Sequence, residues 1–95
     1  MEKRKKIAIV GVGLIGGSLA IQLHEKKLSS KLIGVDANEE HARQAMELEL
    51  VDEVTNLDDA IEQSDVIVLA IPVDKVVELL PSVMDKIENQ IVLDL

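Results

Sequence analysis

The sequence predicts an α/β domain built on a doubly wound parallel sheet, and three observations support this class. Short aliphatic segments alternate with segments of about ten residues that have helical periodicity. A glycine-rich turn follows the first aliphatic segment, and an acidic residue ends the second. The chain has 95 residues, so it can form one small domain only.

Five aliphatic segments are predicted to form the strands. They cover residues 6–10, 31–35, 51–55, 66–71 and 91–95. Ser29 and Ser30 are interpreted as a break before the second strand, and Pro72 as the end of the fourth. Because strands alternate with helices, we expect parallel strands, right-handed crossovers and helices on both faces of the sheet.

Four helices are predicted between these strands. They cover residues 14–25, 39–48, 58–62 and 73–80. Asn38 is expected to cap the second helix, whose inner side would carry Ala42, Ala45 and Met46. Met84 is expected to fill the core, and Pro81 to start a new helical turn. The fourth helix is expected to turn three aliphatic side chains inward, namely Val76, Val77 and Leu80.

A glycine motif, Gly11-Val12-Gly13-Leu14-Ile15-Gly16, follows the first strand and opens the first helix. In a Rossmann-type fold such a motif binds a dinucleotide. Gly11 permits the tight turn, Gly13 lets the backbone approach a pyrophosphate, and Gly16 lets helix and strand pack closely. Backbone N–H groups at the positive end of the helix would hold the pyrophosphate. The alternative is a structural turn that binds nothing.

Asp36 ends the second strand, 20 residues after Gly16. At this position its carboxylate can accept hydrogen bonds from both hydroxyls of the adenosine ribose. Its charge would repel the 2′-phosphate of NADP. Residues 36–65 contain eleven acidic side chains and one basic one, Arg43, so the surrounding charge also disfavours that phosphate. NAD is therefore the expected cofactor.

A second candidate segment lies at the carboxyl end of the fourth strand, beside the predicted cofactor crevice. Ala70, Ile71, Pro72 and Val73 are expected to line the ribose and nicotinamide side. The alternative is a proline that ends a strand, followed by core valines. Val76, one helical turn further on, is either a contact of the adenine or its ribose or a core residue.

Composition excludes several classes of function. The net charge is −8 and the chain has no aromatic residue, so binding to nucleic acid is not expected. Without cysteine there is neither a disulfide nor a cysteine-ligated zinc site, and we expect no metal site. No segment has the roughly 18 consecutive apolar residues of a membrane helix. His24 and His41 are interpreted as surface residues distant from the strand ends, and not as general bases.

Residues 11–20, which read GVGLIGGSLA, resemble prephenate and arogenate dehydrogenases. Further stretches are similar to that family in the same order, at residues 33–36, 51–53, 65–73 and 91–94. The resemblance therefore covers almost the whole chain. It implies cofactor contacts at the fingerprint positions Gly11, Gly13, Leu14, Ile15 and Gly16, at Asp36, and at residues 70–73.

The resemblance also implies a reaction. Such enzymes oxidise the ring alcohol of prephenate by passing a hydride to NAD(P)⁺, with loss of carbon dioxide, and form 4-hydroxyphenylpyruvate in tyrosine biosynthesis. Their catalytic histidine and their helical substrate and dimerisation domain follow the fifth strand. No catalytic residue is therefore expected within residues 1–95. A cytoplasmic location and a homodimeric full-length protein are implied.

The chain is expected to be the incomplete, N-terminal dinucleotide-binding part of a longer protein, cut after the fifth strand. Two rival functions stay open. One is the NAD-binding domain of another dehydrogenase, of the β-hydroxyacid or pyrroline-carboxylate type. The other is a non-catalytic module that senses NAD(H).

The sequence departs from the family pattern at two positions. Glu49 stands where many relatives have the glycine that ends the second helix. A residue with a side chain in a left-handed cap costs about 1 kcal/mol. Ala37 stands where some relatives have an arginine beside the adenine, which puts adenine stacking in doubt.

Overall fold

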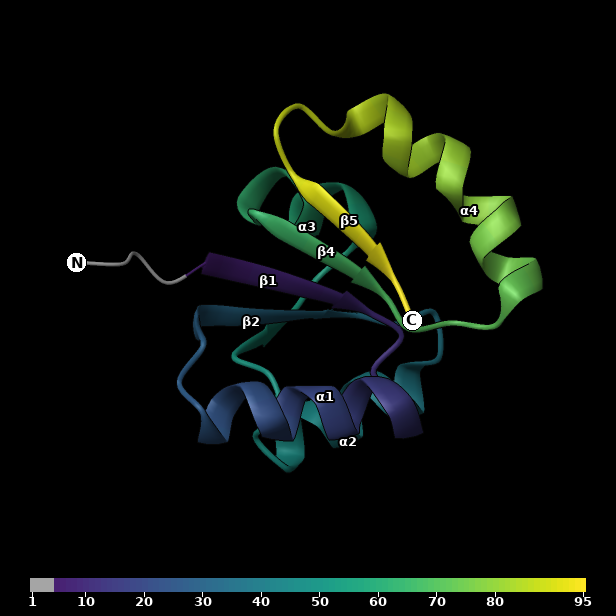
Figure 1. Cartoon of the computed structure of the whole chain (residues 1–95). Coiled ribbons are helices and arrows are strands. Elements are labelled where there is room, and N and C mark those ends of the chain that lie inside the picture. The colour runs from purple at the N-terminus through teal and green to yellow at the C-terminus, as the bar shows by residue number, and fades with distance from the viewer. Residues whose placement is uncertain (1–4) are drawn as a thin grey trace.

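The aliphatic segments form a five-stranded parallel sheet, as predicted (Figure 1). The computed structural model describes residues 5–95, without the side chains of residues 14 and 15. The strands are β1 (Lys5–Val10), β2 (Ser29–Val35), β3 (Glu53–Val54), β4 (Val66–Leu69) and β5 (Ile91–Asp94). Their order in the sheet is β3-β2-β1-β4-β5, and all neighbouring strands are parallel. The direction of winding reverses at β1, so a ligand crevice is expected beyond the carboxyl ends of β1 and β4.

Helices cover both faces of this sheet. They are α1 (Leu14–Glu25), α2 (Glu39–Glu47), α3 (Leu57–Gln63) and α4 (Val73–Lys86). Helices α1 and α2 lie against one face, and α3 and α4 lie against the other (Figure 1). This is the doubly wound arrangement that the alternating pattern predicts.

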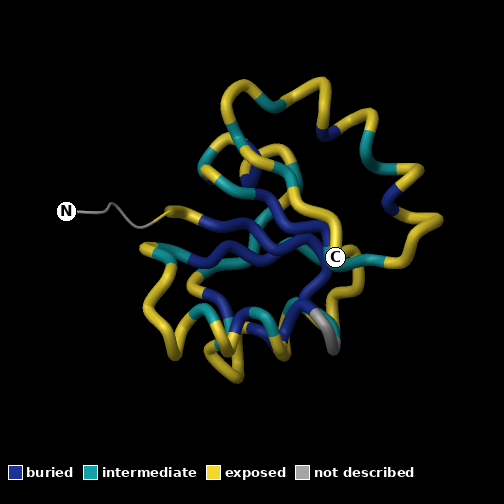
Figure 2. Tube along the Cα trace, in the orientation of Figure 1, coloured by how far each residue is buried: buried dark blue, intermediate teal, exposed yellow. Residues whose placement is uncertain are grey.

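Each face of the sheet has its own hydrophobic core, because neighbouring residues of a strand point to opposite faces. In β1, Ile7 and Ile9 pack toward Ala20 of α1 and Ala45 of α2. The intervening residues of β1 pack toward α3 and α4. The central strands are accordingly the most deeply buried part of the chain (Figure 2).

The start of α2 follows the predicted capping chemistry, and α3 starts with a cap that was not predicted. The side chain of Asn38 accepts hydrogen bonds from the backbone N–H groups of Glu40 and His41, at 2.9 and 3.2 Å. Asn56 caps α3 in the same way through Asp59, at 2.8 Å. Acidic residues occupy the first turn of each helix, where they face the positive end of the helix dipole.

The ends of α1 and α2 share a left-handed residue that carries a side chain. Glu49 has φ +56°, and Lys27, which follows α1, has φ +53°. After α2, the N–H of Leu50 donates to the carbonyl of Ala45, and the N–H of Glu49 donates to that of Met46. These two bonds form a Schellman motif, which glycine normally completes. Glu49 therefore adopts the left-handed cap conformation, and this helix end keeps the shape that a glycine usually gives it.

Two predicted element boundaries are wrong. Ser29 and Ser30 belong to β2, because Ser29 pairs with Lys5 at a bulge in β1. Pro81 lies inside a single 14-residue helix, α4, and does not start a new turn. The side chain of Pro81 is exposed, so the helix continues past it on the solvent side. In addition, β3 has only two residues, and β4 ends at Leu69.

Three residues predicted for the core are exposed. Met46, Val77 and Met84 have relative exposures of 44%, 70% and 55%. On α2 the small side chain of Ala45 is buried against the sheet, whereas the side chain of the next residue, Met46, is exposed to solvent. On α4 the buried positions are Val76 and Val83, seven residues apart, so the buried stripe is narrower than predicted.

Candidate functional site

A hollow of about 690 Å³ lies at the carboxyl ends of the central strands. It is bounded by the end of β1, the turn between β2 and α2, the loop between β3 and α3, and the start of α4. Of the predicted site residues, Gly11, Asp36 and Ile71 line it together. The structure thus brings residues far apart in the sequence to the edge of the sheet where the topology predicts a ligand.

Gly11 and Gly16 are required by the packing of the protein itself. Gly11 has φ +97°, and a Cβ added there would lie 2.6 Å from the carbonyl oxygen of Ala70. A Cβ at Gly16 would overlap the carbonyl oxygen of Gly11. These two glycines therefore allow the first turn of α1 to lie against the end of β1, as predicted.

Gly13 differs from the other two glycines of the motif. Its φ is −72°, so a left-handed conformation is not what requires a glycine there. Among the described side chains, a Cβ there would meet only the ring of His41, at an ordinary contact distance of 3.6 Å. The protein's own packing therefore leaves the space above Gly13 open, and a ligand that approaches the backbone fits this observation.

The start of α1 is also suited to an anion. Gly13 is the N-cap of α1 and provides no side-chain hydrogen bond to the first turn. The N–H groups of a first helical turn have no partner inside the helix and carry partial positive charge. In α2 and α3, by contrast, asparagine side chains occupy these groups. The side chains of Leu14 and Ile15 lie outside the described part of the chain, so their predicted contacts stay predictions.

Asp36 connects the glycine motif to the turn before α2. Its Oδ2 atom accepts a hydrogen bond from the N–H of Val12 at 3.0 Å, and its Oδ1 atom accepts one from the N–H of Asn38 at 2.9 Å. The side chain is only 12% exposed. A carboxylate oxygen can accept two hydrogen bonds, so Oδ1 keeps capacity for a ligand hydroxyl.

The prediction that His41 lies far from the strand ends is wrong. Its Nδ1 atom is 3.3 Å from Oδ2 of Asp36, and its ring lines the hollow beside Gly13. The cause is the cap at Asn38. Because of this cap, α2 starts directly after the end of β2, and its first turn lies beside the glycine motif. His24 lies in the exposed last turn of α1, as predicted.

Residues 70–73 contribute unequally to the hollow. Ile71 lines it, and the carbonyl of Ala70 lies close to Gly11. Pro72 is the N-cap of α4, and Val73 is 78% exposed without lining the hollow. Val76 is 7% exposed and belongs to the core between α4 and the sheet. Its burial favours the alternative that Val76 is a core residue.

Sequence reasoning did not include several residues that line the hollow. Thr55, Asn56 and Leu57 come from the loop after β3, and Lys75, Glu78 and Leu79 come from α4. The loop residues could have been found, since β3 also ends at this edge of the sheet. The residues of α4 depend on the angle at which that helix leaves the loop, and no sequence signal gives that angle.

Ion pairs leave little free positive charge near Asp36. Arg43 is bonded to Glu40 and Glu47, and these hydrogen bonds raise the pKa of its guanidinium. Lys75 forms an exposed pair with Glu78, at 3.6 Å. The one basic residue of the acidic segment is thus already paired, which supports the predicted discrimination against a 2′-phosphate.

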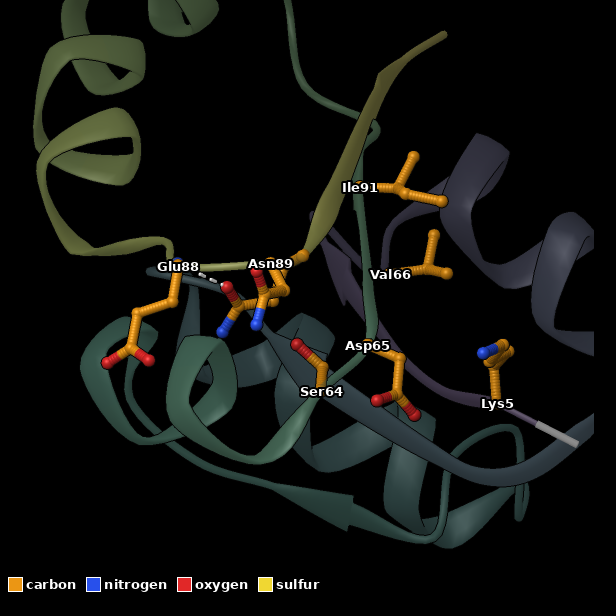
Figure 3. Close-up of a pocket in the computed structure, with 8 residues that line it drawn as sticks. Lys5, Ser64, Asp65, Val66, Glu88, Asn89 and Ile91 are labelled. Carbon is orange, nitrogen blue, oxygen red and sulfur yellow. Dashed lines mark hydrogen bonds between the residues drawn. The ribbon is translucent and has the colours of Figure 1, made fainter. Parts of the chain in front are cut away.

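A second hollow, of about 330 Å³, opens at the opposite edge of the sheet, beside the starts of β4 and β5 (Figure 3). Gln90 lines this hollow. Its side-chain Oε1 atom accepts a hydrogen bond from the N–H of Glu88, and its Nε2 atom donates one to the carbonyl of Ile61. The hydroxyl of Ser64 is buried there without a hydrogen-bond partner among the described residues. None of the predicted site residues lines this hollow.

The described side chains include no group of three or more acidic, histidine or cysteine residues that could hold a metal ion. No helix of the described part is long and apolar enough to cross a membrane.

The fold, the side-chain-free turn and the acid at the end of β2 together define a nucleotide-binding domain of the Rossmann type. Comparison with known proteins gives the family. The profile of the family described as "Prephenate dehydrogenase, nucleotide-binding domain" matches residues 19–95. The chain belongs to this family.

Individual relatives agree with this assignment. A prephenate dehydrogenase from Lactococcus lactis is 33% identical over 79 residues, which are 83% of this chain and 22% of that protein. The structure of prephenate dehydrogenase from Aquifex aeolicus, in complex with hydroxyphenyl propionate and NAD⁺, has a TM-score of 0.86 and 29% identity. It aligns with 99% of this chain and 34% of that one. For Synechocystis arogenate dehydrogenase the TM-score is 0.83 and the identity 32%, over 95% of this chain and 32% of that one. The chain thus spans about a third or less of each relative.

Proposed function

We propose that this chain is the NAD-binding portion of a prephenate dehydrogenase. The observation that carries the proposal is the combination of an uncapped helix start at Gly13 with a fixed carboxylate at Asp36, which lines the hollow. The first group suits a diphosphate and the second suits a ribose with free hydroxyls. The relative from A. aeolicus with NAD⁺ bound supports the choice of cofactor.

Each group has a distinct part in binding. The free N–H groups of the first turn of α1 would donate to the diphosphate, where no Cβ at Gly13 blocks its approach. Oδ1 of Asp36 would accept a hydrogen bond from a ribose hydroxyl, and its charge would repel a 2′-phosphate. Gly11, Gly16 and residues 70–73 would shape the crevice between β1 and β4. When bound, NAD⁺ supplies a hydride acceptor for the substrate.

The activity of the whole protein is proposed from the family. Prephenate dehydrogenases oxidise and decarboxylate prephenate to 4-hydroxyphenylpyruvate, a step of tyrosine biosynthesis, and arogenate is the alternative substrate. We propose that substrate binding, catalysis and dimerisation reside in a helical domain outside this chain, and that the protein acts in the cytoplasm. The 95 residues alone should then bind the cofactor without turning over substrate.

Calorimetric titration of the chain with NAD⁺ and NADP⁺ tests the cofactor proposal. We expect NAD⁺ to bind at least about tenfold more tightly, because Asp36 repels the extra phosphate. Equal affinities, or no binding of either, would contradict the proposal. For the whole protein, formation of NADH that depends on prephenate or arogenate is expected. Its absence with both substrates would contradict the proposed activity but leave cofactor binding intact.

A further inference from the structure

His41 occupies a position between the two groups of the proposed cofactor site. On one side, its Nδ1 atom is 3.3 Å from Oδ2 of Asp36. On the other, the Nδ1 and Cε1 atoms of its ring are both 3.6 Å from where a Cβ at Gly13 would lie. The ring thus borders both the carboxylate proposed to bind the ribose and the space proposed for the diphosphate.

The backbone fixes the direction of this side chain. His41 lies in the first turn of α2, and its N–H donates to the capping side chain of Asn38 at 3.2 Å. The N–H of Asn38 in turn donates to Oδ1 of Asp36. These two linked hydrogen bonds hold the backbone of His41 at a fixed position relative to Asp36. The approach of His41 to Asp36 is therefore built into the turn.

The hydrogen-bonding roles of the ring follow from its partner. An ionised carboxylate only accepts, so Nδ1 carries the proton in the contact with Asp36. Together with the N–H groups of Val12 and Asn38, it gives the carboxylate three donors. Three donors from different directions restrict its rotation, and Oδ1 is left as the oxygen with free capacity.

We propose that His41 is a positioning residue that holds Asp36 for cofactor selection. This inference rests on the proposed NAD site. With His41 present, the carboxylate stays where a ribose hydroxyl can donate to Oδ1 and where a 2′-phosphate is repelled. Without it, the carboxylate keeps only its two backbone donors and is held less firmly, which weakens both the contact with NAD⁺ and the repulsion of NADP⁺.

The test compares the binding of NAD⁺ and NADP⁺ to His41→Ala, His41→Asn and His24→Ala at pH 8. For His41→Ala we expect NAD⁺ affinity to fall about five- to tenfold and the preference for NAD⁺ over NADP⁺ to decrease. His41→Asn, whose amide N–H can replace the donor at Nδ1, should restore most of the preference. His24→Ala removes the exposed histidine in the last turn of α1 and should match the unsubstituted chain.

The outcomes separate this inference from the proposed function. If the unsubstituted chain binds no NAD⁺, the proposed function fails, and this inference fails with it. If it binds NAD⁺ but His41→Ala keeps both the affinity and the preference, only the role of His41 is overturned. A loss of thermal stability in His41→Ala with an unchanged preference would likewise overturn it, because that result indicates a purely structural residue.

Discussion

The three glycines of the motif differ in what requires them. A side chain at Gly11 would be strained by its positive φ, and one at Gly16 would overlap the carbonyl of Gly11. Neither problem exists at Gly13, which meets only the ring of His41 at 3.6 Å. The protein's packing explains the first two glycines, and the proposed approach of a diphosphate explains the third.

Replacement of glycine by alanine should therefore affect protein stability at one position of this motif and cofactor binding at another. Gly16→Ala should lower the free energy of unfolding by about 3 kcal/mol or more, because backbone atoms must move. Gly13→Ala should change it by less than about 1 kcal/mol, yet weaken NAD⁺ binding at least about tenfold. Urea unfolding and calorimetric titration measure the two quantities. Full NAD⁺ affinity in Gly13→Ala would contradict the proposed approach of the diphosphate.

At this scale the sequence predicts the packing roles of Gly11 and Gly16 and the place of Asp36 beside the motif, because each residue type has few physical alternatives in its position. It does not predict His41. Histidine is common on helix surfaces, and only the linked hydrogen bonds through Asn38 bring its ring to Asp36. Contacts of this kind depend on the geometry of a turn, which a residue pattern does not contain.

Among the helices, the predicted cap at Asn38 and the predicted acidic first turn of α3 agree with the structure, because both features depend only on neighbouring residues. Asn38 and Asn56 cap their helices, although the second of these caps was not predicted. Pro81 was misjudged, because a proline inside a helix is tolerated on an exposed side. Ser29 was misjudged because strand pairing with Lys5 outweighs its weak strand propensity.

The left-handed end of α2 allows a stability prediction. Glu49→Gly should raise the free energy of unfolding by about 1 kcal/mol, because glycine adopts φ +56° without steric cost. Thermal unfolding should show an increase of about 4–8 °C in the midpoint. Glu49→Ala is the matched control: it removes the same charge but keeps a Cβ, so it should gain much less. Equal gains in both variants would contradict the explanation by backbone strain.

For the whole molecule, the α1 and α2 face of the sheet is incompletely covered. Ile91 and Leu93 of β5 point to this face, in register with Val66 and Val68 of β4. Neither helix reaches them, and their relative exposures are 58% and 49%. β5 is also an edge strand with unpaired backbone groups, and such strands favour association with further chains.

We therefore expect the 95-residue chain to self-associate at high concentration. Leu93→Lys should shift the mass measured by light scattering toward the monomer, because a charge opposes contact at this face. Leu48→Lys, at a leucine at the end of α2 that is even more exposed than Leu93, should leave the association unchanged. A monomeric unsubstituted chain at millimolar concentration would contradict the prediction.

The overall architecture could be predicted because it follows from three features of the sequence: the alternation of strand and helix segments, the glycine motif, and Asp36 at the end of the second strand. The shape of the hollow could not, since it depends on how far α4 stands from the sheet and on the loop after β3. Both contribute lining residues, such as Lys75 and Thr55. The location of the candidate site was therefore predictable, whereas most of its wall was visible only in the folded chain.

Backbone amide mapping by NMR tests the central claim most directly. During titration of the ¹⁵N-labelled chain with NAD⁺, we expect the largest shifts at the amides of residues 11–16 and 36–41, with NADP⁺ causing much smaller changes at equal concentration. The hollow at the opposite edge, beside Ser64 and Gln90, should be unaffected. Shifts centred on that second hollow, or none within residues 11–16, would contradict the assignment of the cofactor site.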